Sequence, residues 1–454
     1  MLDLLRFLRN RQFSKLLADQ SQFYDQDWTA DSILQWQLCQ FNQLWQNIYL
    51  NVSGFRDLKR NHSLPENFSS WSEFSESLPI MDKHTLQTHR QQFTDSHKKI
   101  DYWRSTGGST GEPIQIPSWN SEKYYSQKDI WHARSWFGVK PSDKLFLIWG
   151  HSHLLGTGFK GWFNGRKRNL SDFLLGYNRF SAYDLSENAL KLAADQILQF
   201  KPDYLISYSV ALDRFAFFNQ EYRDRFHKLN LKVAIATAES FPRSDSADYI
   251  SDILGCPVIM EYGCVETGPI AYQRSAGTFL SFWRHFYIEG LPSSNIPNFY
   301  EILVTCLYPR AFPLVRYKLG DLISVNFEDS SHKKSYHVFD SVVGRCNDFI
   351  QIKGGNVIHS EVFSHVIRDI NSVRSFQVVQ EEDGQICFRY SSSSSMNKND
   401  EKTVRLRLAK IHNDLGQVPF IRVEKLQQTI SGKVKTVISH KGINSQKTSS
   451  ISLE

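Results

Sequence analysis

The sequence has 454 residues, of which 41% are hydrophobic and 22% charged, so it is long enough for two or three globular domains and lacks the composition of a disordered chain. Its formal net charge of +6 comes without a long basic run, which argues against a nucleic-acid-binding protein. Six cysteines with no C-x-x-C spacing argue against a zinc cluster or a disulfide framework and favour a cytoplasmic protein, and no apolar run reaches the about 18 residues of a transmembrane segment.

The first 100 residues are predicted to be mainly helical, and residues 1–75 suggest no function. Beyond residue 140, short apolar strands alternate with helices, which predicts a parallel sheet covered on both faces. Ligands of such sheets bind in loops at the carboxyl ends of the strands. The expected strands are 144–149, 203–209, 231–237 and 256–263, and the expected helices are 186–200, capped by Ser186, 211–220 and 244–255.

After residue 299 the expected strands 299–308, 321–327 and 336–344 follow one another without helices, which indicates an antiparallel or barrel-like subdomain. From about residue 349 we expect a smaller unit with strands 376–380 and 385–391 and a helix near 401–413. Residues 391–400 read as a loop, and the last dozen residues as a frayed tail.

The stretch "STGGSTGEP" (105–113) has the composition of an anion-binding loop. Its glycines let main-chain N–H groups turn toward a phosphate, and its serines and threonines add hydroxyl donors. It lacks the lysine of a P-loop, and a Gly/Ser/Thr stretch alone is as often a linker.

Three distant segments support the phosphate interpretation. "EYGCVETGP" (261–269) ends an expected strand with an aromatic residue and a carboxylate suited to a base and to Mg²⁺. "RYKLGDL" (316–322) supplies an aspartate able to accept two hydrogen bonds from a ribose diol. "VGRCNDFIQIKGGNVIHSEVF" (343–363) combines a Gly-Arg turn, an aspartate and a "KGG" sequence before a Ser-capped helix.

The order and spacing of these motifs resemble the adenylate-forming superfamily of acyl-CoA synthetases, aryl-CoA ligases and adenylation domains. "LPIMDKHTL" (78–86) is similar to the segment before the phosphate loop in the phenylacetate–CoA ligase branch, especially its relatives associated with capsular polysaccharide biosynthesis. "QTISGKVKTVIS" (428–439) resembles the segment that carries the superfamily's catalytic lysine. The resemblance covers roughly residues 75–440.

We expect a helical segment 1–75, which the resemblance does not cover. For the rest of the chain the resemblance implies an α/β fold with a large N-terminal domain 76–347, which has mostly parallel sheets plus the barrel-like subdomain, and a small mobile C-terminal α+β domain 348–454. It implies ATP and Mg²⁺ as cofactors, with CoA as a possible co-substrate. The ATP phosphates would contact Thr106, Gly107, Gly108, Ser109, Thr110 and Gly111.

The same resemblance assigns roles to single residues. Tyr262, next to Gly263, would stack on adenine, with Glu239 at the edge of the nucleotide pocket, and Asp321 would bind the ribose hydroxyls. The catalytic residues would be Glu266, Arg345 and Lys433. Glu266 would hold Mg²⁺, Arg345 would contact the ribose or a phosphate, and Lys433 would stabilise negative charge as pyrophosphate leaves. Asp348 would be the hinge.

The acyl substrate would contact His151, His153 and Tyr208, in segments 149–163 and 208–218. Two histidines at this spacing could bind a metal, but no third ligand is evident, so a polar contact to the substrate is the better interpretation.

Several positions depart from the family pattern. Val265 replaces a common hydroxyl residue before Glu266, Leu319 replaces a threonine before the Gly-Asp pair, Ile114 replaces a lysine that often closes the phosphate loop, and "TAE" (237–239) replaces a "GGE"-like segment.

We therefore expect an ATP-dependent ligase that activates a carboxylic acid as an acyl-adenylate and transfers it to CoA, an amine or a carrier-protein thiol, acting as a monomer or homodimer without nucleic acid. The alternative is a catalytically degenerate relative that binds nucleotide or acts as a scaffold in a biosynthetic complex. Val265 and Leu319 favour the alternative, and the retained Lys433 opposes it.

Overall fold

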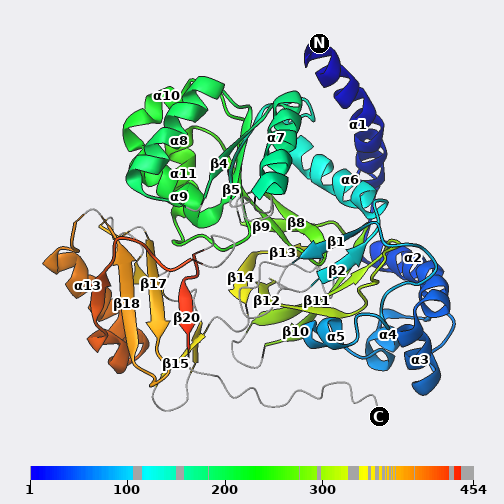
Figure 1. Cartoon of the computed structure of the whole chain (residues 1–454). Coiled ribbons are helices and arrows are strands. Elements are labelled where there is room, and N and C mark those ends of the chain that lie inside the picture. The colour runs from blue at the N-terminus through cyan, green and yellow to red at the C-terminus, as the bar shows by residue number, and fades with distance from the viewer. Residues whose placement is uncertain are drawn as a thin grey trace. The chain divides into compact units, whose positions relative to one another are not determined.

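The computed structural model (Figure 1) describes most of the chain. The described residues are 2–105, 115–149, 158–182, 184–275, 277–293, 298–325, 337–345, 349–352, 357–359, 363, 366–367, 370, 372–373, 375–392, 394–428 and 434–440. The chain forms two compact units. The first takes its residues from 1–10, 137–260 and 344–448, and the second mainly from 11–136 and 261–343. No helix within the described ranges is long and apolar enough to cross a membrane.

The largest sheet has eight strands in the order β13-β9-β8-β7-β6-β5-β3-β4. Its strands β4, β3, β5 and β6 are parallel, whereas β7, β8, β9 and β13 are antiparallel, which confirms an α/β fold with a mixed sheet. The strands are β3 (Leu145–Trp149), β4 (Tyr177–Ser181), β5 (Tyr204–Tyr208), β6 (Val233–Thr237), β7 (Val258–Cys264), β8 (Gly268–Ser275), β9 (Thr278–Ser281) and β13 (Val338–Phe339).

Helices of the first unit pack on the parallel strands. They are α7 (Gly158–Leu175), α8 (Glu187–Phe200), α9 (Ser209–Phe218), α10 (Arg223–His227) and α11 (Ser246–Leu254), with a 3₁₀ turn η2 (Gln220–Tyr222). Every residue of β5 and β6 is buried, as expected for strands covered on both faces. The predicted cap of α8 is confirmed, because the Ser186 hydroxyl accepts the Ala189 N–H at 3.4 Å.

Residues 349–440 contain a small mixed sheet, β19-β18-β17-β20, and the hairpin β15-β16. The elements are β15 (Phe349–Gln351), β16 (Val357–His359), β17 (Ser375–Gln380), β18 (Ile386–Ser391), α13 (Lys398–Ile411), η4 (Asn413–Gln417), β19 (Phe420–Arg422) and β20 (Val437–Ser439). They share a core of their own, built around side chains such as Phe376, Phe388 and Leu408. This is the small α+β part expected from the sequence.

The second unit holds the sheet β10-β11-β12-β14, in which β10, β11 and β12 are antiparallel, together with the hairpin β1-β2 and most of the N-terminal helices. Its elements are α1 (Leu2–Tyr24), α2 (Ala30–Asn51), α3 (Ser53–Asn61), α4 (Trp71–Ser77), α5 (Lys83–Thr88), β1 (Tyr102–Ser105), β2 (Gln115–Ser118), α6 (Glu122–Ser135), β10 (Phe286–Pro292), β11 (Phe299–Cys306), β12 (Tyr317–Ser324) and β14 (Ser341–Arg345).

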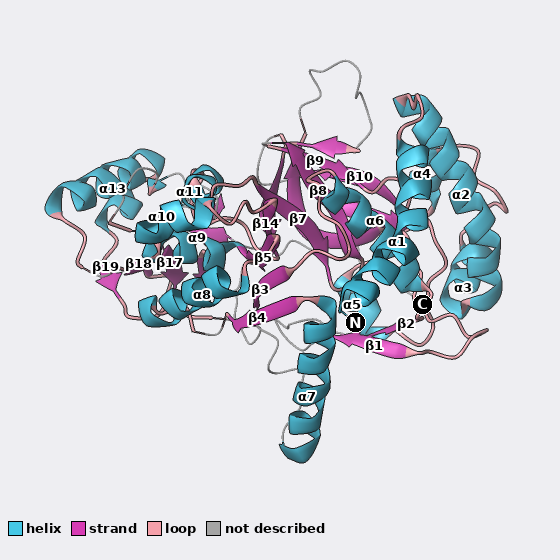
Figure 2. Ribbon diagram, turned by 90° about the horizontal axis from the view of Figure 1, so that it is seen from above, coloured by secondary structure: helices cyan, strands magenta, loops and turns pink. Residues whose placement is uncertain are grey.

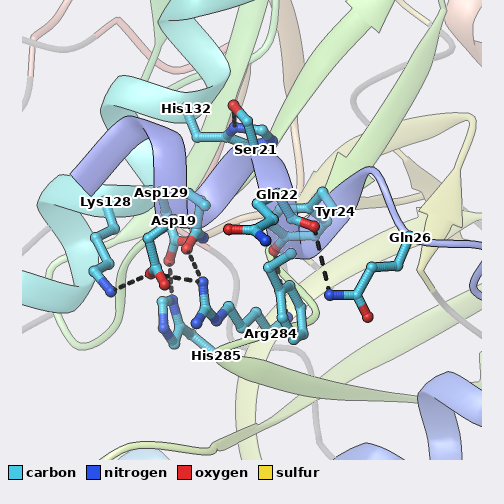
Figure 3. A network of polar contacts seen from close by, with 12 residues as sticks. Asp19, Ser21, Gln22, Tyr24, Gln26, Lys128, Asp129, His132, Arg284 and His285 are labelled. Carbon is cyan, nitrogen blue, oxygen red and sulfur yellow. Dashed lines mark hydrogen bonds and ion pairs between the residues drawn. The ribbon is translucent and has the colours of Figure 1, made fainter. Parts of the chain in front are cut away.

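A buried polar network joins α1 to the second unit (Figure 3). Asp129 of α6 accepts hydrogen bonds from Gln20 Nε2 at 2.7 Å and from His285 Nδ1 at 2.8 Å, and burial raises the pKa of Asp129. At the edge of the network, Lys128 forms an ion pair with Asp19 at 2.7 Å. From residue 11 onward, the N-terminal segment, which the sequence left without a role, is therefore part of this unit's packing.

Two sequence expectations were wrong. Residues 336–344 were expected to form one strand, but the chain turns at Asp340, so β13 pairs with β9 while β14 joins the sheet of β12. Residues 158–163, expected to belong to a substrate-binding loop, are the first residues of α7.

Candidate active site

Tyr262 and Asp321 meet in the second unit. The Tyr262 hydroxyl, near the end of β7, donates a hydrogen bond of 2.9 Å to Oδ2 of Asp321 in β12. The Tyr262 ring is buried and lies edge-on to Phe339, with ring centroids 6.2 Å apart. Gly320, just before the aspartate, has a φ of +81°, a backbone conformation that favours glycine. Two residues that the sequence assigns to one nucleotide are thus in direct contact.

Glu266 lies in the tight turn between β7 and β8. A Cβ atom on Gly263 would lie 2.4 Å from the carbonyl oxygen of Gly268, so the close approach of the two strands requires glycine there. The main-chain carbonyl of Glu266 accepts a hydrogen bond from Arg310 Nη2 at 2.5 Å. Burial, together with the neighbouring Glu266 carboxylate, raises the pKa of Cys264 well above its usual value, so this thiol stays neutral.

A buried glutamate connects this turn to the flank of the predicted phosphate loop. Glu122 Oε2 pairs with Arg104 Nη2 at 2.7 Å and lies 3.5 Å from Arg310 Nε. Its Oε1 accepts the main-chain N–H groups of Trp119 at 2.9 Å and Ala311 at 3.0 Å. Arg104 belongs to β1, which leads into the loop, and Arg310 holds the turn of Glu266. One carboxylate therefore binds two arginines that reach two predicted site segments.

Tyr208 and Glu239 lie in the first unit: Tyr208 is the last residue of β5, and Glu239 follows the carboxyl end of β6. Glu239 Oε1 accepts the main-chain N–H of Val210 at 3.2 Å, and the Glu239 carbonyl accepts the Ser209 hydroxyl at 2.6 Å. The carboxylate is thus at the N-terminus of α9, where it interacts favourably with the helix dipole. The Tyr208 ring packs on Trp149 with centroids 4.3 Å apart. These contacts fix both predicted residues to the edge where ligands of parallel sheets bind.

Most of the other predicted site residues lie outside the described residues: Thr106, Gly107, Gly108, Ser109, Thr110, Gly111, His151, His153, Asp348 and Lys433. The backbone of Arg345 is part of β14, whereas its side chain is not described. The loop of Thr106–Gly111 is flanked by paired strands, because Ser105 of β1 is opposite Gln115 of β2. In the described part of the chain, no three His, Cys, Asp or Glu residues group as metal ligands.

Sequence reasoning missed Arg104, Glu122, Arg310 and Phe339. Glu122 is in the first turn of α6, where an acidic residue is common, so nothing in the sequence marked it as buried. Arg310 offered a weak signal, because a cation within the apolar stretch 302–315 needs a buried counter-charge.

Comparisons with known proteins match this architecture. Residues 350–440 match the family model of the CapK C-terminal domain. The chain is 21% identical to protein CapK of Staphylococcus aureus over 415 residues, which cover 88% of both chains. It is 24% identical to the phenylacetate-coenzyme A ligase of Escherichia coli, over 67% of this chain and 69% of that enzyme.

A solved structure of 2-hydroxyisobutyryl-CoA ligase, in the postadenylation state with R3-HIB-AMP, superposes with a TM-score of 0.69 at 14% identity and covers 90% of each chain. This likeness supports the fold, and the two relatives extend over most of the sequence. Over most of its length the chain is thus similar to CapK and to the phenylacetate–coenzyme A ligases, its residues 350–440 match the CapK C-terminal domain, and its fold is that of an acyl-CoA ligase.

Proposed function

We propose that the protein is an ATP-dependent ligase that activates a carboxylic acid as an acyl-adenylate and transfers the acyl group to the thiol of CoA or to an amine. The observation that carries the proposal is the 2.9 Å hydrogen bond between Tyr262 and Asp321. A ring suited to an adenine face and a carboxylate suited to a ribose diol are adjacent, although 59 positions separate them in sequence.

In the proposed first step, an oxygen of the substrate carboxylate attacks the α-phosphorus of ATP. A phosphorus–oxygen bond forms, the bond from the α-phosphorus to the bridging oxygen breaks, and pyrophosphate leaves. In the second step the acceptor sulfur or nitrogen attacks the acyl carbon, loses its proton, and AMP leaves. The substrate supplies its own nucleophile, so the protein's part is positioning and charge neutralisation.

Glu266 is the residue proposed to hold Mg²⁺. A carboxylate on a turn held by Arg310 is a suitable hard oxygen ligand for Mg²⁺. When bound, Mg²⁺ neutralises phosphate charge. Lys433 and Arg345 are proposed to stabilise the charge that develops on the phosphates.

The proposal is tested by the KM for ATP and the kcat of pyrophosphate release in single variants. Asp321→Ala removes the ribose contacts and is expected to raise the KM about tenfold or more, since a hydrogen bond to a charged group contributes about 1.5–3 kcal/mol. Lys433→Ala should lower kcat by at least about a hundredfold with little effect on ATP binding, because it acts on the transition state. Asp340→Ala, at an exposed aspartate of the same unit, is the matched control. An unchanged KM in Asp321→Ala would refute the nucleotide assignment.

A second candidate function is a nucleotide-binding scaffold without catalysis. The side chain of Val265 is 38% exposed beside Glu266, where the resemblance expects a hydroxyl. A scaffold would bind ATP with an affinity that depends on Asp321, and it would release no pyrophosphate with any acid.

A further inference from the structure

Helix α7 presents an apolar face to solvent. Phe163, Leu170 and Phe173 are 58%, 60% and 63% exposed. Leu170 lies about two helical turns after Phe163, and Phe173 lies about one turn after Leu170. The three side chains therefore lie on one face of the helix. Large apolar side chains gathered on one face mark an interaction site more often than isolated ones do.

The opposite face of α7 is attached to the protein. Asp172 is nine residues after Phe163, about half a turn around the helix, and is buried. It forms a two-bond ion pair with Arg179 of β4, through Nε at 2.7 Å and Nη2 at 3.0 Å. At the end of the helix, Arg9 Nη1 donates to the Leu175 carbonyl at 2.9 Å. Figure 2 shows α7 next to the edge strand β4 and extending beyond it. The outward face is therefore held in a fixed orientation.

The helix is strongly basic as well as apolar. Its sequence contains Lys160, Arg166, Lys167 and Arg168, and its single acidic residue is the paired Asp172, which gives four positive charges against one negative. Lys167 is exposed and lies next to the apolar residues on the helix surface. Basic side chains interspersed with exposed phenylalanine and leucine are typical of helices that lie on an anionic lipid surface.

We propose that α7 docks the protein onto the surface of an anionic bilayer, with Phe163, Leu170 and Phe173 among the acyl chains and the exposed Arg166 and Lys167 at the headgroups. A second copy of the chain fits this face less well, because a two-fold contact through α7 would bring the basic residues of both copies together. A nucleic acid would leave the three apolar side chains without an apolar partner. The proposal is independent of the ligase activity.

The test is co-sedimentation of the full chain with vesicles of phosphatidylglycerol and phosphatidylcholine, compared with phosphatidylcholine alone. The wild type should bind the anionic vesicles, and binding should weaken as salt is added. Leu170→Ser and Phe173→Ser should each lower the partition constant about tenfold, and Lys167→Glu by a similar factor. Leu192→Ser is the matched control, because Leu192 of α8 is also 60% exposed and should leave binding unchanged.

Far-UV circular dichroism confirms that each variant is folded. Absence of binding to anionic vesicles by the wild type overturns the proposal, and so does binding that Leu170→Ser and Phe173→Ser leave intact. An equal loss in Leu192→Ser also overturns it. A wild-type dimer that Leu170→Ser converts to a monomer, without vesicle binding, would assign the face to a second copy.

Discussion

Replacing Glu122 with glutamine tests the buried charge cluster that joins two predicted site segments. The substitution keeps the size of the side chain and removes the charge that faces Arg104 at 2.7 Å and Arg310 at 3.5 Å. With an effective dielectric constant of about 20, these two attractions amount to about 6 and about 5 kcal/mol before desolvation is counted. Removing one partner of a buried ion pair costs about 3–5 kcal/mol in practice, and that is the loss of stability we expect.

The assay is urea unfolding followed by tryptophan fluorescence, with Glu76→Gln as control. Glu76 is an exposed glutamate of α4 in the same unit, and its substitution should have little effect. In Glu122→Gln, Arg310 also loses the charge that orients it toward the Glu266 carbonyl, so pyrophosphate release should fall at temperatures where the variant is still folded. A loss of stability below about 1 kcal/mol would show that Glu122 does not neutralise the two arginines.

Three further predictions concern other parts of the chain. Gly263→Ala should destabilise the protein and abolish ATP binding, because the added Cβ would lie 2.4 Å from the Gly268 carbonyl oxygen; normal ATP binding would contradict the description of the turn. Arg243→Met should increase hydrogen exchange in residues 367–373, since the buried guanidinium donates to three main-chain carbonyls there at 2.6, 3.0 and 3.3 Å; unchanged exchange would contradict it. Burial lowers the pKa of His132 to about 4, so stability should fall as the pH drops from about 6.5 to about 4, and His132→Phe should remove that part of the slope; an identical slope in both proteins would refute it.

Of the four parallel strands, β3, β5 and β6 were predictable because strands buried on both faces have continuous apolar sequences, whereas β4, none of whose residues is buried, was missed. Each residue of β5 and β6 is buried, and each run was recognised to within two residues at either end. The cap at Ser186 was predictable for a similar reason, since a local side-chain contact decides it.

The features that could not be predicted depend on contacts between residues that are distant in the sequence. Glu122 binds Arg104, which is 18 positions away in the sequence, and Ala311, which is 189 positions away. Its local sequence resembles that of an ordinary exposed helix start. Helix α7 was missed because Gly158, Gly161 and Gly165 read as loop residues, whereas its attachment depends on the ion pair with Arg179.

The nucleotide-binding residues were predicted from the order of the motifs and not from the sequence around each residue. Nothing near Tyr262 indicates that its hydroxyl donates to Asp321, and a core tyrosine would have the same neighbours in sequence. The resemblance brought the two residues into one proposed site, and their contact supports that proposal.

Pyrophosphate release from ATP and Mg²⁺, measured with a panel of aryl, fatty, amino and sugar acids with and without CoA, tests the central claim most directly. We predict release that depends on one class of acid and is lost in Lys433→Ala. Continued turnover that requires CoA would identify a thioester product. ATP binding without release for any acid would contradict the ligase and favour the scaffold, and absence of ATP binding would refute the nucleotide site itself.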